Sequence, residues 1–292
     1  MEEIRKKERH LSFGKVFLAS LLAVVAGSVL SGLFWLGLFS SLSSLMQAEV
    51  VAVPEKAVLR IDLRENLVDA PSRNPMSQFN FATMSMGGQL TLYDALRAIE
   101  AAAADDRISG IYINLSGMGT AEIAAIEELR QAILDFKAAS GKFVVAYNSI
   151  YTQWGYYLAT AADRIYIEPE GSFEWAGLSM STLFFKGLID KLGVEMTILR
   201  PTACKYKSAV EPFIRTDMQV LAGNLWGVLT EAVSTARGID EAELNRLADN
   251  LEVMLPQEAE EHNFVDGTMY VDEVMETMEA DYGISDPEFI SL

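Results

Sequence analysis

Cysteine and histidine are almost absent from this chain, which has one of the first and two of the second among 292 residues. The single thiol, Cys204, cannot form an intrachain disulfide or build a zinc site from several thiolates. His10 precedes a long uncharged segment, so a Ser-His-Asp triad in the rest of the chain would depend on His262. Since His262 lies in an acidic stretch, base chemistry is expected from lysine, aspartate or glutamate instead.

Positive charge is scarce as well. The chain has 23 lysines and arginines against 41 aspartates and glutamates, a formal net charge of -18. Residues 1–15 hold five of the basic groups and three of the acidic ones, which leaves residues 49–292 with 18 and 38, a formal charge of -20. A domain this acidic repels phosphate backbones, so nucleic acid is excluded as a partner.

No charged residue occurs between Lys15 and Glu49. About 20 apolar residues are enough to cross a bilayer, so this stretch can span one. A cleaved signal peptide would have an apolar region of roughly 7 to 15 residues and a small-x-small cleavage site, and residues 45–48 make a poor site. The sequence therefore predicts an uncleaved transmembrane anchor at residues 16–40, followed by a linker at 41–56.

The basic residues predict how the anchor is oriented. Five precede it, whereas Lys56 and Arg60 are the only ones in the fifteen positions from Glu49 onward. Basic flanks stay on the cytoplasmic side, so residues 1–15 are expected inside the cell. The large domain, residues 57–292, is then expected on the periplasmic or outer side of the cytoplasmic membrane.

Short apolar runs alternate with helical spacing in the large domain. Leu92, Ala95, Leu96 and Ile99 follow the helical i, i+3, i+4, i+7 pattern, and apolar residues recur every three or four positions from Ile123 to Phe136. This alternation predicts an α/β fold with a mostly parallel sheet flanked by helices. Residues 64–90 read as a long loop, and residues 217–282 as mostly helical with breaks at Gly238, Pro256 and Gly267. The runs expected to be strands are Val58 to Leu63, Ile111 to Leu115, Phe143 to Tyr147, Arg164 to Glu168 and Glu195 to Leu199.

Two segments offer candidate chemistry. Gly117 and Gly119 lie in a turn between a predicted strand and a helix, where backbone amides can hold an anion or a developing oxyanion. A tight structural turn is the alternative, and Glu122 stands where a dinucleotide fingerprint needs its third glycine. Lys205 and Lys207 follow the last predicted strand, and burial could make Lys207 a base. From spacing alone, an exposed surface lysine is the favoured interpretation. Cys204 is expected to be a small buried residue.

After the predicted N-terminal anchor, four segments fall in order along nearly the whole chain. They are the predicted strand Val58 to Leu63, the run Gly155-Tyr156-Tyr157-Leu158-Ala159-Thr160-Ala161-Ala162-Asp163-Arg164, the run Lys186-Gly187-Leu188-Ile189-Asp190-Lys191-Leu192-Gly193, and Tyr206-Lys207-Ser208-Ala209-Val210-Glu211-Pro212-Phe213. Together with the anchor, these segments resemble signal peptide peptidase A of the long type, in peptidase family S49.

The resemblance implies a ClpP/crotonase-like fold and a Ser-Lys dyad, in which the first of two homologous halves supplies the lysine and the second the serine. The base would be Lys207. One-domain relatives hold the nucleophilic serine two residues before the Gly-Tyr-Tyr run, and this chain has Gln153 there. The chain thus resembles the first half of such an enzyme, and the oxyanion role of Gly117 and Gly119 would need a serine in the same half.

The expected function is that of a membrane-bound endopeptidase that cleaves residual signal peptides together with a serine-bearing C-terminal half-domain, in a homo-oligomer that the family implies to be a tetramer. No cofactor or metal is expected. A non-catalytic, membrane-tethered assembly subunit of the same fold is the alternative. An acyl-CoA enzyme of the crotonase type is disfavoured, because CoA is anionic and cytoplasmic whereas the domain is acidic and expected outside.

Overall fold

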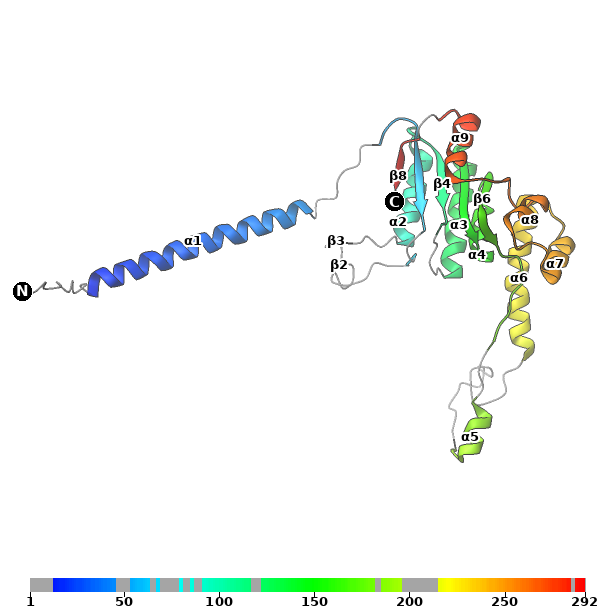
Figure 1. Ribbon diagram of the computed structural model, residues 1–292, viewed down its shortest axis with the longest axis horizontal. Coiled ribbons are helices and arrows are strands. Elements are labelled where there is room, and N and C mark those ends of the chain that lie inside the picture. Colours follow the sequence, from blue (N-terminus) through cyan, green and yellow to red (C-terminus); the bar gives the residue numbers. More distant parts are fainter. Residues whose placement is uncertain are drawn as a thin grey trace, which may run out of the picture. The chain divides into compact units, whose positions relative to one another are not determined.

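The computed structural model describes residues 13–45, 53–63, 67–68, 79–80, 85–86, 91–116, 122–181, 185–195, 215–284 and 287–291 (Figure 1). The chain divides into two compact units, Met1–Ala52 and Val53–Leu292. The units are considered separately below.

Helix α1, Phe13–Leu45, is the regular element described in the first unit. Leucine, alanine and valine dominate it, and side chains 13–37 are exposed on every side. Its serines bond inside the helix: Ser20 Oγ donates to Val16 O at 2.9 Å and Ser28 Oγ to Val24 O at 2.8 Å. Such bonds satisfy hydroxyls where water is absent. The segment Phe13–Gly37 is long and apolar enough to cross a membrane.

The second unit is built on a six-stranded sheet in the order β7-β6-β5-β4-β1-β8, and every neighbouring pair in it is parallel. β-Branched and aromatic residues fill its central strands, as buried parallel strands require. A separate antiparallel pair joins β2, Phe79–Asn80, to β3, Ser85–Met86. The strands of the main sheet are β1 Ala57–Asp62, β4 Ile108–Asn114, β5 Phe143–Tyr151, β6 Arg164–Phe173, β7 Gly267–Thr268 and β8 Phe289–Ser291.

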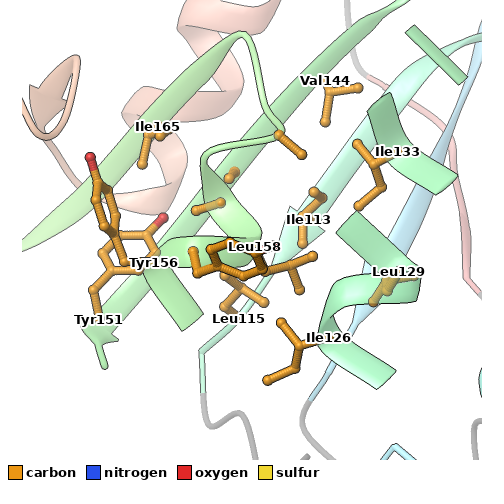
Figure 2. Packing of buried hydrophobic residues seen from close by; sticks show 14 of the residues in the cluster. Ile113, Leu115, Ile126, Leu129, Ile133, Val144, Tyr151, Tyr156, Leu158 and Ile165 are labelled. Carbon is orange, nitrogen blue, oxygen red and sulfur yellow. The ribbon is translucent and has the colours of Figure 1, made fainter. Parts of the chain in front are cut away.

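Helices cover both faces of this sheet. The larger core packs one face against α2, Leu92–Ala104, α3, Ile123–Ser140, and α4, Gln153–Ala159. Figure 2 shows Ile126, Leu129 and Ile133 of α3 directed toward the strands in this core. The smaller core packs the other face against α9, Val271–Tyr282.

The remaining helices are α5 Lys186–Leu192, α6 Arg215–Arg237, α7 Glu241–Asn250 and α8 Pro256–Glu261. Helix α6 ends where Gly238 takes the left-handed conformation, φ 69°. Pro256 is the first residue of α8, where its missing N–H costs no hydrogen bond. The breaks predicted at Gly238, Pro256 and Gly267 are therefore confirmed.

The predicted fold class, a mostly parallel sheet flanked by helices and preceded by one apolar helix, is confirmed. Four of the five predicted strands are β1, β4, β5 and β6. The fifth, Glu195 to Leu199, lies outside the described residues except for Glu195, which is not in a strand. The sequence did not predict α4, β7 or β8. Of the expected loop at 64–90, six residues are described, and four of them form β2 and β3.

Candidate active site

The candidate site lies at the carboxyl ends of β4 and β5. Parallel sheets bind ligands at this edge, because the loops that follow the strands gather there. After β4 the chain reaches Ser116, whose backbone N–H donates to Asn114 Oδ1 at 3.1 Å. After β5 the chain turns at once into α4. The site is therefore framed by the end of one strand and the start of one helix.

Thr152 is the N-cap of α4. Its Oγ1 accepts the N–H of Gly155 at 3.2 Å, which satisfies one of the unpaired amides of the first helical turn. Gly155, Tyr156 and Tyr157 are all buried. This local sequence fixes position 153 as the first helical residue, and its side chain reaches the segment after β6.

Gln153 is buried, with 6% of its surface exposed, and its carboxamide is bonded on both sides. Oε1 accepts the backbone N–H groups of Ala176, at 3.2 Å, and Gly177, at 3.0 Å. Nε2 donates to the carbonyl of Gly177 at 2.9 Å. The side chain thus joins the start of α4 to the segment after β6. A carboxamide has no nucleophilic oxygen to attack a peptide carbonyl, so position 153 cannot act as a serine does.

Aromatic residues enclose α4 from the side of the core. Tyr156 Oη donates to Phe264 O at 2.6 Å, and Tyr151 Oη donates to Tyr166 O at 3.2 Å. Burial raises the pKa of both phenols above the ordinary value of 10. Both tyrosines stay neutral and fully used as structural donors, so neither is available as an acid or base for the site.

The structure leaves most of the predicted site residues untested. Lys207, the predicted base, lies outside the described residues, as do Lys205 and Cys204. Gly117 and Gly119 also lie outside them. Of the residues that the family resemblance assigns to the active site, Gln153 is the one that the structure describes.

His262 lies at the end of a helix in the C-terminal part of the chain. It is the C-cap of α8. Its charged neighbours are Glu243 and Glu252, whose pKa values are lowered chiefly by hydrogen bonds from Arg246 and to a smaller extent by His262. His262 is half-buried and lies near the ion pairs that Arg246 forms with Glu243 and Glu252. Among the described residues, no three histidine, cysteine, aspartate or glutamate side chains are grouped as metal ligands.

Sequence reasoning missed a polar cluster at the same edge of the sheet. Asn114, 5% exposed, donates from Nδ2 to Asp62 Oδ1 at 2.6 Å, and Arg60 Nε lies 2.7 Å from Asp62 Oδ2. These residues continue strands β1 and β4 on the face that is apolar further back. The change from apolar to polar at alternate positions, as in Val58, Arg60 and Asp62, was the signal that could have revealed it.

The sequence of this chain is similar to those of known proteases. Protease 4 of Haemophilus influenzae is 35% identical over 201 residues, which cover 64% of this chain and 32% of that protein. Protease 4 of Salmonella typhi is 33% identical, over 65% and 32% of the two chains. The chloroplastic serine protease SPPA of Arabidopsis thaliana is 29% identical, over 63% and 28%. The matched segment thus spans about a third of each relative.

Among solved structures, a mutant of the 1510-N membrane-bound stomatin-specific protease aligns with a TM-score of 0.45 and 13% identity, over 81% of this chain and 98% of that one. Residues 136–285, which run from the end of α3 past α9 and include Gln153, match the description Peptidase family S49. That stretch is about half of the chain. The chain therefore belongs to peptidase family S49.

Proposed function

We propose that this chain is the lysine-donating part of a membrane-anchored serine endopeptidase of the signal peptide peptidase A type, which cleaves residual signal peptides after their release. Lys207 is the general base, and the nucleophilic serine comes from a second, serine-bearing half-domain. Family membership and the names of the matched proteases support the serine-protease chemistry.

The observation that carries the proposal is that the Gln153 side chain is buried and hydrogen-bonded. At the position where one-domain relatives hold serine, this chain has a buried carboxamide that makes three hydrogen bonds to backbone groups of Ala176 and Gly177. A residue engaged in this way stabilises the fold of its own half and supplies no nucleophile. The hydroxyl must therefore be provided by another half-domain.

Lysine chemistry sets a condition on Lys207. A base must be neutral when it accepts the serine proton, yet a lysine with the ordinary pKa of 10.4 is neutral in only about one molecule in 2,500 at pH 7. Burial lowers a lysine pKa, because an apolar environment penalises the ammonium form. Tyr206, Val210 and Phe213 surround Lys207 in the sequence and can provide that environment once the partner half covers it.

Membrane anchoring is part of the same proposal. In it, residues 1–15 are cytoplasmic, residues 16–40 span the cytoplasmic membrane, residues 41–56 form a linker and residues 57–292 act on the outer side. The exposed apolar surface of α1 supports the span, and the five basic residues before it support the orientation. A homo-oligomer, implied by the family to be a tetramer, would bring the half-sites together.

The test is reconstitution. The full chain in detergent is combined with a serine-bearing half-domain of the same family, and cleavage of a signal peptide is followed. Lys207→Ala removes the amine, and Lys207→Arg keeps a charge that cannot lose its proton near neutral pH. Both should abolish turnover, whereas Lys205→Ala should retain most of it.

Other outcomes would contradict the proposal. If Lys205→Ala is inactive while Lys207→Ala is not, the lysine motif is misplaced by two residues. If no serine-bearing half gives turnover that depends on Lys207, the chain is a non-catalytic assembly subunit. Labelling of the chain alone by a serine-directed fluorophosphonate would place a complete active site within it.

A further inference from the structure

A pocket opens at the carboxyl edge of the sheet, on the face covered by α9. Its volume is about 710 Å³. The residues that line it come from four strands and from the start of α9. They are Arg60, Asn114, Ser116, Tyr147, Ser149, Glu168, Tyr270, Val271 and Asp272.

The register of the strands explains why this pocket is polar. In the sheet, Arg60 is aligned with Tyr112, Asn114 with Tyr147, and Tyr147 with Tyr166. Side chains two residues apart share a face, so Glu168 lies on the face of Tyr166. Nearer the amino ends this face is apolar and is packed by Val274 and Met278 of α9. Past Tyr147, polar residues replace the apolar ones, and the core gives way to the pocket.

Tyr147 lies at the boundary between the apolar core and the pocket. Its ring belongs to the core and only 5% of the residue is exposed, but it also lines the pocket. Within the described part of the chain its hydroxyl has no hydrogen-bond partner. The hydroxyl is not among the buried polar atoms that lack a partner, although the residue as a whole is buried. It therefore opens to the pocket, and a group that enters the pocket would find it available.

Two carboxylates accompany the hydroxyl. Glu168 is half-buried and Asp272 is exposed, and neither forms an ion pair or hydrogen bond with another described residue. Both carboxylates line the same pocket as the Tyr147 ring. Burial, and then the charges of Glu168 and Asp272, raise the pKa of Tyr147 to about 12. Arg60, the cation in the lining, is held by Asp62 at 2.7 Å. The pocket thus presents unpaired negative charge beside two tyrosine rings.

We propose that this pocket binds the cationic side chain of a lysine or arginine residue in a peptide. Carboxylates accept the N–H groups of an ammonium or guanidinium, and tyrosine faces attract organic cations. The choice of a peptide as the source of the cation rests on the proposed function. Binding itself requires neither the serine-bearing half nor turnover.

The test measures binding by isothermal titration to the full chain in detergent at low salt. The probes are a short capped peptide with one arginine, the same peptide with neutral citrulline in its place, and agmatine as a free cation. The arginine peptide and agmatine should bind and the citrulline peptide should not. Glu168→Gln and Asp272→Asn should each weaken binding about tenfold or more, whereas Glu170→Gln, exposed on the same strand and outside the pocket, should not.

Tyr147→Phe separates a binding role from a structural one. The hydroxyl has no partner to lose among the residues that the structure describes, so this variant should weaken binding of the arginine peptide while its melting temperature does not fall. Absence of saturable binding to the unmodified chain, or equal binding by the three pocket variants and by Glu170→Gln, would overturn the proposal. Binding of agmatine without binding of the arginine peptide would overturn the peptide as the source of the cation.

Discussion

The carboxamide of Gln153 accepts two backbone N–H groups and donates to one carbonyl, so it ties the start of α4 to the segment after β6. A serine at this position is too short to reach the same three groups. The residue that, in the proposal, stands in place of the nucleophile therefore also adds a structural link, and the two effects can be measured separately.

Gln153→Ala should lower the free energy of unfolding by about 1–2 kcal/mol, measured by urea denaturation of the chain in detergent. Loss of hydrogen bonds to buried groups costs up to about 3 kcal/mol each. The cost is at the lower end here, because Ala176 is exposed and Gly177 half-buried, so water can replace the lost partners. An unchanged unfolding midpoint would show that the link carries no stability.

Gln257→Ala is the matched control. Gln257 is exposed and makes one bond, from Nε2 to Pro169 O at 3.3 Å. Its truncation should change the free energy of unfolding by less than about 0.5 kcal/mol. A comparable loss in both variants would mean that the effect at position 153 does not come from the buried amide.

The role of a single residue could be predicted from the sequence only where a short local motif contains the information. The departure at Gln153 is visible beside the Gly-Tyr-Tyr run, because the motif is local. Its partners, Ala176 and Gly177, are not visible, because a bond between α4 and the segment after β6 depends on how the sheet folds. The roles of Lys207, Gly117 and Gly119 stay predictions.

The turn from α2 to β4 shows how one element begins where another ends. Asp105 is the C-cap of α2, and its carboxylate accepts from Arg107 Nε at 3.0 Å and from Arg107 Nη2 at 2.6 Å. Lys142 Nζ donates to the carbonyls of Ala102 and Asp105, both at 2.7 Å. These bonds satisfy carbonyls that the end of a helix leaves unpaired.

Hydrogen bonds from Arg107 lower the pKa of Asp105 from 3.8 to about 2. The folded pKa lies below the unfolded one, so the stabilisation by this pair is complete above about pH 4 and is lost as the pH falls through 2. Carbon NMR of the Asp105 carboxyl should show a titration midpoint near 2. In Arg107→Ala the midpoint should return toward 3.8, and a midpoint near 3.8 in the unmodified chain would contradict the assignment.

Elements were predictable in proportion to their length. Runs of β-branched and aromatic residues predict strands β1, β4, β5 and β6, and the spacing of apolar residues predicts helices α2 and α3. Strand β7 has two residues and β8 three, too few to show a period, and both form by pairing with strands distant in the chain. Helix α4 is buried nearly all round, so it lacks the polar face that marks a surface helix.

At the scale of the whole molecule, the proposed orientation in the membrane rests on the charges that flank the apolar helix. The proposal predicts that protease added to intact spheroplasts digests the domain of residues 53–292, because five basic residues hold the N-terminus inside. Immunoblotting with an antibody against the domain measures its loss. Protection in intact spheroplasts together with digestion after lysis would mean that the orientation is reversed.

The position of β8 bears on how the domain assembles. Strand β1 pairs with β4, but its other edge pairs with β8, at residues 289–291, which are more than 200 residues further along the chain. Until those residues are in place, β1 exposes a row of unpaired backbone groups beside apolar side chains, and incompletely folded chains associate wrongly at such edges. The sheet therefore stays open until β8 pairs, and a chaperone that shields β1 during that interval, in the compartment where the domain folds, would raise the yield of folded protein.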